Sequence, residues 1–186
     1  MLGLGHAYPM NGFFRRQLVE YVEYHRDPRN CGMHVLGITT LFLGAVMPLT
    51  QVPVELLGLR VNLAMILASP VLLYWLVLDA ALGMGLVFAA AVLLTAASFI
   101  AAHVSPHAMW AIFAVLLVVG FAAQAIGHSV FEQRKPSLLD HPVHFLLGPP
   151  FVMAKLFNLF GFRRDLAAII EAPPPPLQAA IPVEQR

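Results

Sequence analysis

Three histidines and one glutamate are the residues of this sequence whose spacing best suits chemistry. His25 and His34 lie nine positions apart, and His128 and Glu132 lie four positions apart. On an α-helix, side chains four positions apart share a face, with Cβ atoms about 5–6 Å from each other. That spacing suits two ligands of one metal, or a metal ligand beside an acid–base partner. Imidazoles with a carboxylate and open positions are typical of non-haem Fe(II) sites that react with O₂.

The residues between His25 and His34 predict a bend that brings the two rings together. Asp27 is a favoured N-cap, and Pro28 fits the first position of a helix because its missing N–H is not needed there. The residue before a proline also resists helical backbone angles. We therefore expect His25 to end one helix and His34 to lie in the next. Three residues of the first helix could hydrogen-bond these rings: Glu20, Tyr21 and Tyr24.

The composition predicts that the elements holding these residues lie in a membrane. Of the 186 residues, 59% are hydrophobic and 11% are charged, whereas soluble domains have about 25% charged residues. Asp79 carries the only formal charge between Arg60 and Glu132. A bilayer removes the need for a polar exterior. The net charge of +1 gives no case for a nucleic-acid partner.

Four apolar stretches predict an all-α, polytopic membrane protein. A spanning helix needs about 20 mostly apolar residues. The four predicted spans are Met33 to about Thr50, Val61 to Leu78, Leu82 to His103, and His107 to Gly127. Residues 1–171 are expected to form a single integral-membrane domain, and the proline-rich residues 172–186 a disordered tail.

Two further segments are expected to lie at the membrane surface. Met1 to Tyr24 lacks a continuous apolar run and predicts an amphipathic N-terminal helix. Val143 to Phe160 is apolar, but the run Gly148-Pro149-Pro150 interrupts it. We therefore expect a re-entrant or interfacial helix in this C-terminal region.

Basic residues predict which side of the membrane the termini occupy. Cytoplasmic segments carry an excess of Lys and Arg, and such residues flank the first and fourth spans. These residues are Arg15, Arg16, Arg26, Arg29, Arg134 and Lys135. Both termini are therefore expected to be cytoplasmic, in a bacterial inner membrane or the endoplasmic reticulum. On this topology His25, His34 and His128 share the cytoplasmic face, and His103 and His107 lie on the other.

Each histidine also has a structural interpretation. An isolated histidine at a membrane surface is more often hydrogen-bonded or directed to water than a metal ligand, and His103 and His107 have no carboxylate near them. A lone pair such as His128 and Glu132 is likewise more often structural. Three imidazoles with a carboxylate at one membrane face favour a site, because ionisable groups are costly there.

Two segments around these histidines resemble the signatures of a known family. The first reads Tyr24-His25-Arg26-Asp27-Pro28-Arg29-Asn30, with His34 four residues on. The second reads Gln124-x-x-Gly127-His128-x-x-Phe131-Glu132-x-x-x-Pro136-x-Leu138-x-Asp140, and Gly148-Pro149 followed by Phe151 resembles the motif after it. Over roughly Tyr21 to Phe160, the chain resembles the small multi-pass membrane 2-hydroxy fatty acid dioxygenases, formerly catalogued as a domain of unknown function.

The resemblance implies an Fe(II)-dependent dioxygenase that uses O₂ to remove one carbon from a 2-hydroxy fatty acid, as in fatty acid α-oxidation. It makes His25, His34 and His128 the iron ligands. The acid would chelate the metal through its carboxylate and hydroxyl groups, with O₂ at an open position. Such a substrate is dissolved in membrane lipid, and this would explain why the enzyme lies in a membrane.

The other catalytic groups are less well defined by the resemblance. Glu132 is the best candidate for a fourth ligand, or else it orients a histidine. Arg26, Arg29 or Arg134 could offset the negative charge of the substrate. We take Glu132 and Arg26 as the catalytic candidates.

The sequence also departs from the family pattern. Lys155 stands where the family often has Glu, so a carboxylate from that position cannot be part of this site. His141 and His144 lie outside the signature. Their role, and whether one or two metals bind, stays open.

Two functions of other classes are alternatives. The chain could be a non-enzymatic membrane protein that binds lipids or acts as a scaffold, with structural histidines. A metal transporter would need polar residues in the middle of its spans, and spans two to four offer only Ser69, Thr95 and Ser98 there. Metal analysis of detergent-purified protein would separate the first alternative from the enzyme.

Overall fold

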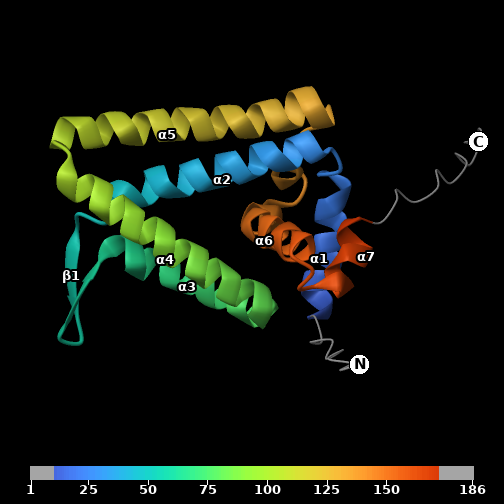
Figure 1. Ribbon diagram of the computed structural model, residues 1–186, viewed down its shortest axis with the longest axis horizontal. Helices are drawn as coiled ribbons and strands as arrows, with labels where there is room; N and C mark the ends of the chain where they lie inside the picture. Colours follow the sequence, from blue (N-terminus) through green and yellow to red (C-terminus); the bar gives the residue numbers. More distant parts are fainter. Residues whose placement is uncertain (1–10, 172–186) are drawn as a thin grey trace, which may run out of the picture.

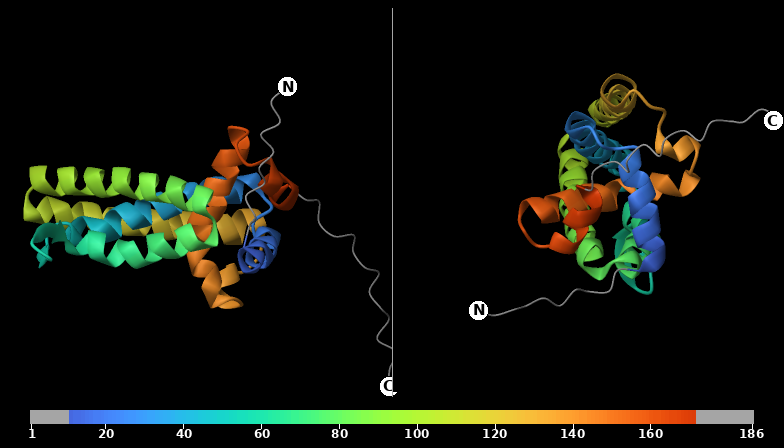
Figure 2. Two further views of the ribbon diagram at one scale, coloured as in Figure 1. Left: turned by 90° about the horizontal axis from the view of Figure 1, so that it is seen from below. Right: turned by 90° about the vertical axis from the view of Figure 1, so that its right-hand side faces the viewer.

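Four apolar helices run lengthwise, each opposite in direction to the next along the chain, in the computed structural model, which describes residues 11–171 (Figure 1, Figure 2). They are α2 (Pro28–Leu49), α3 (Leu63–Leu78), α4 (Ala80–His103) and α5 (Pro106–Ile126). α2 packs against α5 and α4, while α3 packs against α4. Large apolar side chains point outward, since Phe88 is 73% and Val118 68% exposed. Such an exterior suits surroundings that are themselves apolar.

The structure shortens one of the four predicted spanning helices. Within residues 11–171, three helical stretches are long and apolar enough to cross a membrane: Pro28–Leu49, Ala80–His103 and Pro106–Glu132. The predicted span Val61 to Leu78 is instead α3, with 16 residues. At 1.5 Å per residue α3 is about 24 Å long, shorter than the roughly 30 Å of a bilayer core. Three candidate spans and one shorter apolar helix indicate an integral membrane protein.

A β-hairpin that the sequence analysis did not predict separates α2 from α3. Strands β1 (Pro53–Leu56) and β2 (Leu59–Asn62) pair antiparallel. Leu57 and Gly58 form the turn, with φ angles of 52° and 79°, as in a type I′ turn. Because β2 includes the first two residues of the predicted second span, α3 begins later and is shorter than expected.

Shorter helices gather at the end of the molecule opposite the hairpin (Figure 1, Figure 2). They are α1 (Gly12–Glu23), the 3₁₀ helices η2 (Ser137–Leu139) and η3 (Pro142–Leu146), α6 (Gly148–Leu159) and α7 (Arg164–Ile170). Phe14 and Leu18 of α1 belong to a buried apolar cluster with Phe151 of α6 and Leu166 of α7. α1 therefore lies, with an inward apolar face, where an amphipathic helix was predicted.

The predicted C-terminal segment Val143 to Phe160 is divided in two. η3 ends at Leu146, and α6 starts at Gly148 with prolines in its first turn, where a missing N–H is tolerated. α6 then packs against α2 and α4. The predicted tail at residues 172–186, like residues 1–10 of the predicted N-terminal helix, lies outside the described residues.

A buried ion pair ties this end of the molecule to the turn between α3 and α4. Asp79 caps α4 by accepting a hydrogen bond from the Leu82 N–H at 3.0 Å. Its carboxylate also accepts two hydrogen bonds from Arg163, at 2.8 and 2.9 Å. Arg163 holds Asp165 as well, at 2.7 Å. Because Asp79 and Arg163 are both buried, the joint between α6 and α7 is fixed to the long helices.

Candidate metal centre

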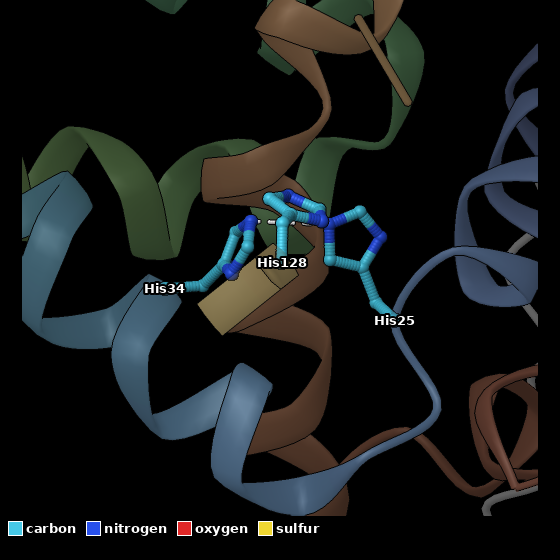
Figure 3. Close-up of side chains that lie close together, drawn as sticks. All are labelled: His25, His34 and His128. Carbon is cyan, nitrogen blue, oxygen red and sulfur yellow. Dashed lines mark hydrogen bonds between the residues drawn. The ribbon is translucent and has the colours of Figure 1, made fainter. Parts of the chain in front are cut away.

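The bend before α2 forms as the sequence predicts. The Asp27 side chain accepts a hydrogen bond from the Arg29 N–H at 2.8 Å, and Pro28 lies in the first turn of the helix. His25 therefore lies in the connection between α1 and α2, and His34 lies within α2. The side chains of both histidines turn toward one point (Figure 3).

His128 reaches that point from the far end of α5, through a widened helical turn. Residues Gly127–Glu132 form a π-helix, η1, that continues α5 where an α-helix was predicted. A Cβ on Gly127 would overlap the Asn30 side chain of α2, so the glycine allows the two helices to meet here. Such π turns are frequent at functional sites. This one carries both His128 and Glu132.

Three buried imidazoles converge from the bend, α2 and η1 (Figure 3). His25, His34 and His128 are 1%, 4% and 6% exposed. Their ring centroids lie between 4.5 and 5.1 Å apart, in edge-to-face pairs. One ring nitrogen from each lies within 4.8 Å of the other two. The structure thus brings together the three histidines that the sequence analysis selected, which we call the three-histidine centre.

Hydrogen bonds fix which ring nitrogens face the middle of this centre. Nδ1 of His25 donates to the Tyr21 carbonyl at 2.8 Å, and Nδ1 of His34 donates to the Asn30 carbonyl at 3.1 Å. A neutral imidazole has only one N–H, so Nε2 of both rings carries a lone pair. These two Nε2 atoms lie 3.0 Å apart. Two lone pairs at that distance repel each other unless a cation lies beside both.

The donor set fits a metal ion. Metal–nitrogen bonds of about 2.1 Å place two ligand nitrogens roughly 3.0 to 3.4 Å apart, close to the 3.0 Å between Nε2 of His25 and of His34. Nδ1 of His128 is buried without a hydrogen-bond partner in the described part of the chain. Burial, assisted by the neighbouring His34, lowers the pKa of His25 to about 2, so this ring is neutral, as a metal ligand must be.

Glu132 anchors the bend that carries His25. Its Oε1 accepts a hydrogen bond from the Arg26 N–H at 3.0 Å. Its Oε2 accepts from the Asp27 N–H at 3.0 Å and from the Asn30 side-chain amide at 3.1 Å. Both oxygens are therefore engaged at the start of α2, where the helix favours negative charge. The carboxylate joins η1 to the segment that holds the other two histidines.

The three arginines considered for the substrate differ in their surroundings. Arg26 directly follows His25 in the bend. Arg29 forms an exposed ion pair with Asp27 at 2.8 Å. Arg134 donates to a main-chain carbonyl of α1 at 2.9 Å. Arg29 and Arg134 thus hold the surface of the bend, whereas Arg26 adjoins a histidine of the centre.

Two residues support the centre in ways that the sequence analysis did not assign. Tyr21 was expected to hydrogen-bond a histidine, and it does so through its backbone carbonyl, while its ring stacks on His25 with centroids 3.9 Å apart. Asn30 is fully buried and connects Glu132 to His34. Its side-chain amide donates to Glu132, and its backbone carbonyl accepts from the His34 ring. A polar residue in the first turn of an apolar helix was the available signal for Asn30.

The surroundings of His103 and His107 agree with the structural interpretation of these two histidines. Both are exposed, and they lie at the junction between α4 and α5. Nδ1 of His103 donates to the Phe99 carbonyl of its own helix at 2.7 Å. This junction lies at the hairpin end of the molecule (Figure 1), away from the three-histidine centre.

Comparison with known proteins gives one family for most of the chain. The profile of a family described as Mpo1-like, 2-hydroxy-palmitic acid dioxygenase Mpo1-like, matches residues 12–159. The 2-hydroxy-palmitic acid dioxygenase MPO1 of Saccharomyces cerevisiae is 28% identical over 158 residues, which cover 84% of this chain and 87% of the yeast protein. No solved structure matches the chain. The matched range contains all three histidines of the centre and Glu132.

Proposed function

This chain belongs to the Mpo1-like 2-hydroxy-palmitic acid dioxygenase family, and from this premise we propose that it is an Fe(II)-dependent enzyme that removes one carbon from 2-hydroxy fatty acids. The observation that carries the proposal is the approach of the Nε2 atoms of His25 and His34 to 3.0 Å, buried beside His128. Imidazole ligands with open positions suit iron and O₂ chemistry. The apolar helices suit a substrate dissolved in lipid.

Three ring nitrogens, from His25, His34 and His128, would hold the iron and leave positions open. Bound there, Fe(II) would supply binding positions for O₂ and for the carboxylate and hydroxyl groups of a 2-hydroxy acid. The carbonyls of Tyr21 and Asn30 fix the orientation of two of the rings, as is usual for histidine ligands. The arrangement of these donors is therefore set by the fold itself.

Glu132 acts, in this proposal, as a positioning residue rather than as a ligand. Its two oxygens hold the N–H groups of Arg26 and Asp27 and the amide of Asn30. Through these bonds it keeps His25 close to α2, while Glu132 itself lies on η1 with the third histidine. Loss of the carboxylate would loosen the ligands relative to one another.

Arg26 is our candidate for offsetting the negative charge of the substrate carboxylate. It follows His25 directly, and Glu132 fixes its backbone N–H at 3.0 Å, so its side chain starts from a defined point beside the centre. Arginine can pair with a carboxylate through two parallel hydrogen bonds. Arg29 and Arg134 instead bond at the surface of the bend, to Asp27 and to a carbonyl of α1.

The acyl chain of the substrate would lie against the apolar surface beside the centre. Val35 and Leu36 adjoin His34 and are 43% and 46% exposed, and Val130, near His128, is 57% exposed. A chain dissolved among membrane lipids could reach the histidines along this surface without crossing water. This arrangement supports a membrane enzyme whose substrates are a 2-hydroxy fatty acid and O₂.

The centre lies, in this proposal, at the cytoplasmic face of a bacterial inner membrane or of the endoplasmic reticulum, with both termini on that side. The excess of Lys and Arg in the segments that flank the centre supports this orientation. A reporter that is active only in the cytoplasm, fused to the C-terminus, is expected to give signal. Signal only from a reporter that requires the opposite compartment would reverse the orientation.

The proposed function is tested by turnover of a defined acid. With Fe(II) and O₂, detergent-purified protein is expected to convert 2-hydroxypalmitate to the acid one carbon shorter, as measured by mass spectrometry. Palmitate is the matched control: it lacks the hydroxyl needed for two-point binding and is expected to react poorly. Equal turnover of the two acids would contradict two-point binding. No turnover of either acid by iron-loaded protein would favour a lipid-binding protein with structural histidines.

A further inference from the structure

A second group of potential metal ligands lies on the other side of Tyr21. It consists of Glu20 on α1, His141 directly before η3, and His144 within η3, with one ligand atom of each within 4.8 Å of the other two. The two imidazole rings are 4.8 Å apart between centroids. Nε2 of His144 lies 3.9 Å from Oε2 of Glu20. This group, which we call the Glu20 cluster, shares no residue with the three-histidine centre.

His144 is the member of the cluster that indicates a partner from outside the chain. Its side chain is 0% exposed, and neither ring nitrogen has a hydrogen-bond partner among residues 11–171. Buried polar atoms are nearly always paired. In its neutral form this ring has a lone pair for a cation.

We propose that Glu20, His141 and His144 bind a second divalent transition-metal ion, separate from the ion of the three-histidine centre. Two imidazoles and one carboxylate form a donor set that suits Zn²⁺ or Fe²⁺. Gln17 donates a hydrogen bond to Oε2 of Glu20 at 3.3 Å, which orients the carboxylate as supporting bonds do at metal sites. Because Glu20 and His141 are exposed, the ion enters from the water side.

The neighbouring charges leave the Glu20 carboxylate available to a cation. Among the side chains that the structure describes, Glu20 forms no ion pair with a lysine or an arginine. The nearby basic side chain of Lys135 is held by Asp140 at 2.6 Å. Asp140 also accepts a hydrogen bond from the Tyr24 hydroxyl at 3.1 Å. Asp140 is thus already paired, whereas Glu20 lies beside the two histidines.

An ion in the Glu20 cluster would fix α1 against η3 and thereby support the first centre. The Tyr21 ring lies between the two groups, since it stacks on His25 at 3.9 Å and meets His144 edge-on at 5.5 Å. Holding Glu20 in place therefore also holds the neighbouring Tyr21 against His25. The second ion has a structural role here, and it contributes no ligand to the three-histidine centre.

Metal stoichiometry tests this inference. Untagged, detergent-purified protein saturated with Zn²⁺ and then desalted is expected to hold about two ions per chain. Glu20→Gln and His141→Ala change exposed side chains, and each is expected to lower the count to about one. His34→Ala is expected to do the same at the other centre, and its combination with Glu20→Gln should remove both ions. Glu23→Gln, on the same helix, and His107→Ala, at the far junction, are matched controls that should keep both.

Visible absorption of Co²⁺ bound to the His34→Ala protein reports on the Glu20 cluster alone, and the signal is expected to disappear in the His34→Ala, Glu20→Gln double variant. Circular dichroism verifies that each variant is folded. About one ion per chain in the saturated, unsubstituted protein, together with none in His34→Ala, would overturn the inference. So would an unchanged count in both Glu20→Gln and His141→Ala. Neither outcome bears on the dioxygenase proposal, which depends on three other histidines.

Discussion

Histidines lie at both ends of the long helices, but their surroundings at the two ends differ. At the hairpin end His103 and His107 are exposed, and His103 bonds to a carbonyl of its own helix. At the opposite end His25, His34 and His128 are buried together, and the lone pairs of His25 and His34 face each other. A histidine near a membrane surface therefore says little by itself. Buried, unpaired nitrogens contributed by separate segments are what indicate a candidate metal centre.

Removing one histidine at a time is the strongest test of this difference. Each of the variants His25→Ala, His34→Ala and His128→Ala is expected to lose the ion of the three-histidine centre, because two imidazoles alone hold an ion weakly. In iron-loaded protein this loss is about one iron per chain. His103→Ala is the matched control and should change nothing. Mass-spectrometric metal analysis of detergent-purified protein gives the result. Full metal content in all three variants would mean that the histidines at the two ends do not differ in metal binding.

Removing the buried ion pair tests whether the end of the molecule with the three-histidine centre depends on it for stability. Asp79→Asn leaves the Arg163 guanidinium buried with one carboxylate fewer, and is expected to lower the free energy of unfolding by about 3 kcal/mol. Asp165→Asn, at the more exposed partner of Arg163, should lower it by less than about 1 kcal/mol. Denaturant titration followed by circular dichroism measures both. Similar losses in the two variants would show that the buried pair has no special part in stabilising this end.

Glu132→Gln distinguishes a positioning residue from a ligand. Gln offers one acceptor oxygen where the carboxylate offers two, so at least one N–H donor near the bend loses its partner. We expect the free energy of unfolding to fall by about 2 kcal/mol and iron affinity to fall by about tenfold. Turnover should fall further than metal content, and Glu23→Gln should alter neither. Parallel loss of metal and turnover would identify Glu132 as a ligand.

The smallest expected effect is a gain in stability at the hairpin end. Leu57 is 96% exposed and has a φ of 52°, which is strained for a leucine. Leu57→Asn gives the turn the Asn-Gly pair that type I′ turns favour and should raise the free energy of unfolding by roughly 0.5 kcal/mol. Iron content should not change. A loss of iron in this variant would show that the two ends are coupled.

The sequence was most informative where the physical signal is local. The Asp27-Pro28 pair predicted the bend between His25 and His34, and the structure confirms it, because caps and prolines act on their immediate neighbours. Of the four spans that the long apolar runs predicted, three match candidate spans, with ends displaced by a few residues. The type of helix at Gly127–Glu132 was not predictable in this way, since hydropathy does not distinguish an α turn from a π turn.

Contacts between distant segments account for most of what was missed. No local pattern specifies that Glu132 binds N–H groups 105 and 106 residues earlier in the chain. The same is true of His141 and His144, which meet Glu20 only in the fold. The hairpin was missed for a different reason: its turn has Leu57 where Asn would have been a recognisable signal.

The distance along the chain between the ligands has a consequence for biosynthesis. His34 leaves the ribosome 94 residues before His128, a delay of about 5 to 20 s at ordinary rates of translation. During that interval the bend exists without η1, and an ion that arrived would meet two of its three imidazoles. In the proposed enzyme, iron loading would therefore follow the insertion of α5, and a nascent chain that stops before Gly127 would lack the third ligand of this centre.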